Sequence, residues 1–174
     1  PQGQPVAGPA GQVTPATQNP PPAPTVPAPP PPNVLRFGVH SPAYVAVVDP
    51  LGRTCGLVLP GPTLIRQIPG CNATEAGIEP QLVDVPDAPG GAYSLVVSPK
   101  GTGGPYTLTA SAVAGASLIF NFAQGGTIGT GEKQGSKIDV DAGVDGTLSA
   151  AGLAGITILE KSPIKAVIAA AVPL

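Results

Sequence analysis

The chain has 174 residues, of which 42% are hydrophobic and only 10% charged, and its formal net charge is −2 at pH 7. Its 8 basic and 10 acidic residues are too few and too balanced to attract a phosphate backbone, so the composition excludes nucleic acid as an expected partner. With three Phe, three Tyr and no Trp or Met, the core must be built mainly from small aliphatic side chains.

The first 33 residues form a proline-rich arm that contains thirteen prolines and no charged side chain. Such a segment has too few apolar residues to pack a core, and its proline clusters favour extended polyproline II. At roughly 3 Å per residue it would reach on the order of 100 Å. Two interpretations remain open for residues 1–33: a linker from an anchor, or an ordered arm that lies along a neighbouring subunit.

Ten short runs rich in Val, Ile, Leu, Thr and Tyr follow the arm, and each is expected to form a strand. Their ranges are 34–39, 43–49, 55–59, 63–68, 81–85, 92–98, 106–113, 117–122, 136–140 and 155–160. Turn-forming residues separate them, as in the DPLG run at 49–52 and the Gly-rich run at 100–104. We therefore expect an antiparallel β-sandwich, Ig-like or jelly-roll-like, over residues 34–174.

The only two cysteines, Cys55 and Cys71, flank a run that contains three prolines. A disulfide between them is the expected pairing, with two buried free thiols as the alternative. Zinc is not expected, because a zinc site needs four ligands and His40 is the only histidine. A disulfide would place the protein in an oxidising compartment, most simply outside the cell or at its surface.

Two segments share a pattern in which a tyrosine is followed two positions later by a leucine, at 91–97 (GAYSLVV) and 104–109 (GPYTLT). Alternation along a strand places Tyr93 and Leu95 on one face, and likewise Tyr106 and Leu108. We expect the two segments to pair as a hairpin across the Gly-rich loop.

This pair of segments resembles the GxYxLxV hairpin of bacterial pre-peptidase C-terminal domains and related secreted β-sandwich modules. The run at 41–53 (SPAYVAVVDPLGR) is similar to the strand and turn found in surface-protein repeats of that kind. The resemblance covers about residues 35–125 and implies a secreted β-sandwich module. Because its motifs encode turns and core positions, it bears on fold far more than on activity.

The sequence offers few groups for catalysis or metal binding. His40 stands beside Ser41, but adjacent residues of a strand point to opposite faces, so they form no nucleophile and base pair. Asp139, Asp141 and Asp145 are a calcium candidate, since oxygen ligands at this spacing can wrap a hard cation, although they also fit a solvated strand and turn. No cofactor is expected. Asn72 begins an Asn-Ala-Thr triplet, which is a candidate N-glycosylation site.

The C-terminal residues are apolar, but charged residues and a proline interrupt them, so no membrane-spanning helix is expected. A strand is favoured over a helix for residues 164–174 because of its β-branched content and the preceding Pro163. Such a strand would fill a groove in a neighbouring copy or complete its own sandwich.

Together these features predict a non-enzymatic extracellular structural or interaction protein. It would be a cell-surface or filament-forming subunit that binds copies of itself or another surface protein through its terminal segments, with 34–39 or 164–172 as the exchanged strand. The alternative is an accessory domain of a secreted hydrolase. A small-molecule substrate is not expected, and six Phe and Tyr residues without Trp argue against a carbohydrate-binding platform.

Overall fold

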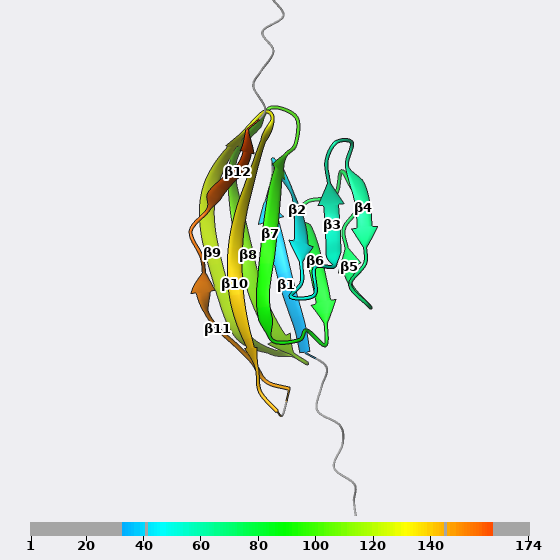
Figure 1. Cartoon of the computed structure of the whole chain (residues 1–174), viewed down its shortest axis with the longest axis vertical. Helices are drawn as coiled ribbons and strands as arrows, with labels where there is room; N and C mark the ends of the chain where they lie inside the picture. Colours follow the sequence, from blue (N-terminus) through cyan, green and yellow to red (C-terminus); the bar gives the residue numbers. More distant parts are fainter. Residues whose placement is uncertain (1–32, 41, 145, 162–174) are drawn as a thin grey trace, which may run out of the picture.

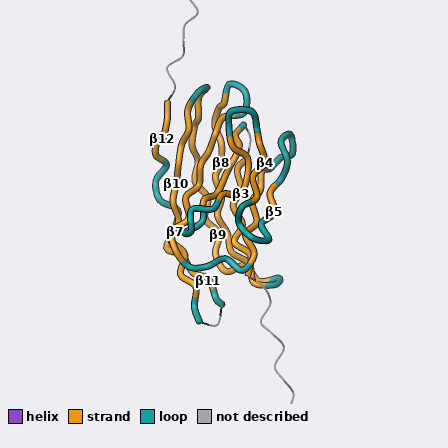
Figure 2. The backbone as a smooth tube through the Cα atoms, turned by 45° about the vertical axis from the view of Figure 1, so that its right-hand side comes forward, coloured by secondary structure: helices purple, strands orange, loops and turns teal. Residues whose placement is uncertain are grey.

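The structure is a computed structural model that describes residues 33–40, 42–144 and 146–161. The described residues form two antiparallel sheets that pack face to face (Figure 1), so the predicted β-sandwich is confirmed. Strands and loops alone make up this part of the chain, as Figure 2 shows, and it contains no helix that is long and apolar enough to span a membrane.

The smaller sheet has five strands in the order β5-β6-β1-β8-β9. Their bounds are β1 Asn33–His40, β5 Asn72–Ala73, β6 Gln81–Pro86, β8 Gly103–Ala114 and β9 Ser117–Gly129. Strand β1 lies at the centre and pairs with β6 on one side and β8 on the other. The segment 34–39, predicted as an exchanged strand, is thus paired on both edges within its own chain, which corrects that prediction.

The larger sheet has seven strands, six of them in the order β11-β10-β7-β2-β3-β4, with β12 also paired to β10. Their bounds are β2 Ala43–Val48, β3 Thr54–Val58, β4 Thr63–Arg66, β7 Gly91–Pro99, β10 Glu132–Ala142, β11 Leu148–Leu153 and β12 Thr157–Lys161. Strands β11 and β12 follow one another along the same side of β10 (Figure 1).

All ten predicted strands are present, but the sequence missed β5 and β11. Strand β9 runs seven residues beyond its predicted end at 122, and β10 also extends past both of its predicted limits. Strand β1 begins at Asn33, one residue before the predicted boundary of the sandwich. The predicted arm, up to residue 32, and the predicted strand at 164–174 lie outside the described residues.

The predicted hairpin between the two Tyr-x-Leu segments is wrong. Tyr93 and Leu95 lie on β7 of the larger sheet, whereas Tyr106 and Leu108 lie on β8 of the smaller sheet. The loop between them carries the chain from one sheet to the other, and the amide of Lys100 bonds the carbonyl of Pro42 at 2.8 Å. Each Tyr and Leu pair does share one face, and all four side chains point inward and are buried.

The core lies between the sheets and follows the alternation of side chains along each strand. Leu35, Phe37 and Val39 of β1 are fully buried, and so are Tyr93 and Leu95 of β7. The rings of Phe37 and Tyr93 meet across the core with centroids 5.9 Å apart. The hydroxyl of Tyr93 donates to the carbonyl of Pro89 at 2.8 Å, so this buried ring keeps a partner for its polar end.

A second polar contact ties the sheets together at β8 and β10. The hydroxyl of Tyr106 donates to Oε1 of Gln134 at 2.7 Å, and Nε2 of Gln134 donates to the carbonyl of Thr127 at 2.7 Å. Burial raises the pKa of Tyr106. A Cβ added to Gly126 would lie 2.5 Å from the Tyr106 ring, so only glycine fits opposite this tyrosine on β9.

We predict that Tyr106→Phe lowers the free energy of unfolding by about 1–3 kcal/mol, because it leaves Oε1 of Gln134 buried without its donor. The measurement is urea unfolding followed by circular dichroism. Tyr44→Phe is the matched control, since this tyrosine lies only half-buried on the outer face of β2. Equal losses in the two variants would contradict the role given to the buried contact.

Candidate functional site

The two cysteines form a disulfide, as the sequence predicted. Their sulfur atoms lie 2.17 Å apart, with 6.6 Å between the Cα atoms. Cys55 is on β3 of the larger sheet, and Cys71 immediately precedes β5 of the smaller sheet, so the bond ties the sheets together along one side. Both cysteines are buried.

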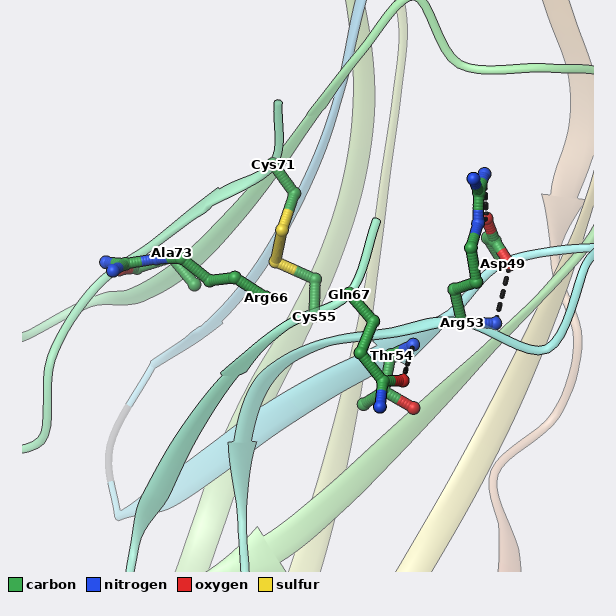
Figure 3. The surroundings of a disulfide bond; sticks show 8 residues. All are labelled: Asp49, Arg53, Thr54, Cys55, Arg66, Gln67, Cys71 and Ala73. Carbon is green, nitrogen blue, oxygen red and sulfur yellow. Dashed lines mark hydrogen bonds and ion pairs between the residues drawn. A yellow bond between two sulfur atoms is a disulfide. The ribbon is translucent and has the colours of Figure 1, made fainter. Parts of the chain in front are cut away.

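Polar contacts around the disulfide hold the same side of the sandwich in place (Figure 3). Arg66 of β4 donates to the carbonyl of Ala73 in β5 at 3.1 Å, which links the edge strands of the two sheets directly. Oε1 of Gln67 accepts the amide of Thr54 at 3.0 Å. The short strands β4 and β5 are thus fixed by covalent and polar contacts rather than by a large apolar area.

Breaking the disulfide should destabilise the sandwich. We predict that the double variant Cys55→Ala/Cys71→Ala loses roughly 3 kcal/mol of unfolding free energy, because the unfolded chain regains the loop entropy that the bond removes. Guanidinium unfolding with and without a thiol reductant measures this. The reductant should lower the free energy of unfolding of the native chain and leave that of the double variant unchanged. An unchanged free energy in the native chain, after the bond is shown to be cleaved, would contradict the prediction.

The turn after β2 is built on a buried carboxylate that the sequence did not single out as a site. Asp49 accepts the amide of Leu51 at 3.0 Å. It also accepts the amide of Arg53 at 2.8 Å and the guanidinium of Arg53 at 2.7 Å (Figure 3). Burial by itself would raise the pKa of Asp49, but the hydrogen bonds from Arg53 and Leu51 outweigh it, and the pKa is lowered. The carboxylate is a structural anchor, since each of these partners belongs to its own turn.

We predict that Asp49→Asn costs about 1–3 kcal/mol at neutral pH, because the amide loses the charge that pairs with Arg53. The pKa of Asp49 is lower in the folded than in the unfolded chain, so its contribution is complete above the unfolded value, about 3.9. It is lost as the pH falls through the folded value.

The measurement for Asp49→Asn is the urea midpoint of native chain and variant from pH 7 to pH 2. The gap between the two should be constant above about pH 4 and should narrow below it. Asp87→Asn, at an exposed turn position, is the control and should change little. A gap that widens on acidification would contradict the assignment.

The calcium candidate is only partly described. Asp139 and Asp141 are exposed on β10, where they alternate with the buried Ile138 and Val140, and Asp145 lies outside the described residues. Within residues 33–40, 42–144 and 146–161, no group of three or more His, Cys, Asp or Glu side chains is placed to hold a metal ion. The two described aspartates therefore sit as the solvated-strand interpretation expects.

The other candidate residues lie on the surface and apart from one another. His40 is exposed at the end of β1, and its neighbour Ser41 is outside the described residues. Asn72 is exposed on the two-residue edge strand β5, directly after the disulfide, so its side chain is accessible to modification. Among the candidate residues that the structure describes, it brings together only the two cysteines.

The outer face of the larger sheet is hollowed and apolar. One hollow on it has a volume of about 400 Å³ and is lined in part by Val96 of β7, Gly135 of β10 and Leu159 of β12. A second hollow of about 160 Å³ adjoins it at Val96 and continues to Ala46 and Leu57. Ala46 and Leu57 are buried although they lie outside the main core, so small side chains give this face a concave, weakly polar surface.

Comparison with protein families, with curated proteins and with solved structures finds no match. The resemblance to pre-peptidase C-terminal and surface-repeat modules therefore stays a prediction. The disulfide is compatible with the oxidising compartment that the predicted extracellular or cell-surface localisation implies.

Proposed function

We propose that the protein is a non-enzymatic extracellular subunit that works by contact, in a cell-surface layer or a filament, through segments attached to the ends of its sandwich. One observation carries this proposal. The described chain begins at Asn33 at one end of the long axis and ends at Lys161 at the opposite end (Figure 1). An arm attached at one end of the sandwich can reach the opposite end of a neighbouring copy, which is what a head-to-tail array needs.

The surface of the sandwich supports the same proposal. The hollow around Val96 is concave and mainly apolar, with Lys137 as the charged residue in its lining. Lys133, which lines the adjoining hollow, pairs with Glu160 at 2.8 Å. An apolar centre with a charged border is how protein contact surfaces are usually arranged. The partner is a second copy of this chain or another surface protein.

The proline-rich arm is the segment to which we assign the contact between subunits. A polyproline II segment loses little conformational entropy when it docks, so a long uncharged arm is a favourable ligand for a neighbouring sandwich. Its first attached strand, β1, is the central strand of the smaller sheet, so a pull on the arm is transmitted directly to the core.

We predict that deletion of residues 1–32 abolishes or shortens the assemblies of the native chain while leaving the sandwich folded. Sedimentation velocity and negative-stain imaging measure assembly, and circular dichroism checks the fold. The control replaces the same residues by a Gly/Ser segment of equal length. If the arm docks on a neighbour, the Gly/Ser replacement should not restore assembly. Full assembly of either variant would show that the arm is only a tether.

A further inference from the structure

Strand β9 leaves one edge of the smaller sheet open. It is thirteen residues long, contains no charged residue and no proline, and pairs with β8 alone among the residues that the structure describes. Of the other edges, β5 has two residues, β4 is short and carries Arg66, and β12 carries the paired Glu160 and Lys161; β11 is uncharged like β9 but has only six residues. A long, uncharged edge is a template for one more strand.

The side chains of β9 that face the core are incompletely covered. Phe120 and Phe122 stack on each other, with centroids 5.2 Å apart, and pack against the core, but both stay partly exposed. Farther along the same face, Oε1 of Gln124 is buried and has no hydrogen-bond partner within the described part of the chain. The core is thus open, and one polar atom is unsatisfied, along this edge.

The opposite sheet shows the same opening. Ile158 of β12 lies beside Gln134 of β10, which faces the core, so Ile158 also points inward. It is nevertheless 60% exposed. The edge of β9 and the inward side of Ile158 are therefore both uncovered by the described residues, and we call the region between them the slot.

The described chain ends at the mouth of this slot. Nζ of Lys161 lies 3.0 Å from Oε1 of Glu132, and Oε2 of the same carboxylate accepts the amide of Gly129, the last residue of β9, at 2.9 Å. Only Thr130 and Gly131 separate β9 from β10 as the chain crosses between the sheets there. A crossing back from β12 to the edge of β9 is correspondingly short, and Ser162 and Pro163 are available for it.

We propose that residues 164–172 of the same chain fill this slot as a strand antiparallel to β9. Their sequence, IKAVIAAAV, has one charge, on Lys165. With Lys165 in solvent, alternation turns Ile164, Ile168 and the other even-numbered residues inward, toward Phe122 and Ile158. The added strand pairs the backbone of β9 and covers both phenylalanines. This goes beyond the proposed function and narrows it: residues 164–172 stay within their own sandwich, so contact with neighbours is left to the arm.

The first test places a photoreactive benzoylphenylalanine at Ala123, an exposed position on the outer face of β9, in the full chain. The expected product runs as a monomer on a denaturing gel, and mass spectrometry finds the β9 peptide joined to the peptide that contains residues 164–172. A dimer-sized product joined to that peptide would show that a neighbouring copy supplies the strand, and no crosslink to it would show that the slot is filled otherwise. Either result overturns the proposal.

The second test compares Ile168→Lys with Val167→Lys, which add the same charge at adjacent positions. Hydrogen exchange of the β9 amides measures whether the strand remains in place. Ile168→Lys should speed exchange of alternate β9 amides at least tenfold, whereas Val167→Lys, which faces solvent, should leave it near the native rate. Equal exchange in the two variants overturns the proposal. Both tests report on the monomer, so they stand apart from assembly through the arm.

Discussion

The contact between β1 and β7 is the interaction on which the rest of the sandwich depends. These strands lie inside opposite sheets, and the rings of Phe37 and Tyr93 pack across the core between them. Because aromatic residues are so few, this pair supplies area that the small aliphatic side chains around it cannot. Strands β6 and β8 beside β1, and β2 and β10 beside β7, are then placed by backbone pairing, and their inward residues fill the remaining space.

The sequence located the strands well and their partners poorly, for one physical reason. Alternation and turn residues are local, so each of the ten predicted runs became a strand. The loop at Lys100 and Gly101 has the turn chemistry of a hairpin, yet it crosses between the sheets. A hairpin and a crossing use the same residue types, and the choice depends on which sheet each inward face must cover. Strand β11 was missed because Ala and Gly give it little strand propensity.

The candidate site residues divide in the same way. The disulfide could be predicted because only two cysteines exist, so no alternative pairing had to be excluded. The Asp49 anchor lies within a turn whose residues were recognised, but its burial comes from the surrounding fold. Tyr106 and Gln134 are 28 positions apart in the sequence, and no local pattern indicates their contact. Side chains whose partners are distant in the sequence therefore cannot be identified from local sequence patterns.

Charge placement explains why the β9 edge of this sandwich is open. A chain with so few charged residues cannot protect every edge with them: β9 and β11 carry none, whereas β12 carries two and β10, inside its sheet, carries five. Glu132 is central to this arrangement, because its carboxylate joins the end of β9 to Lys161 and so fixes where the chain leaves β12. The uncharged edge of β9 ends close to the point where the chain leaves β12. Pairing with the segment that follows β12 protects such an edge better than charge does, since a paired strand satisfies the backbone as well as covering the core. The open side of the sandwich is thus a consequence of the small number of charged residues in the chain.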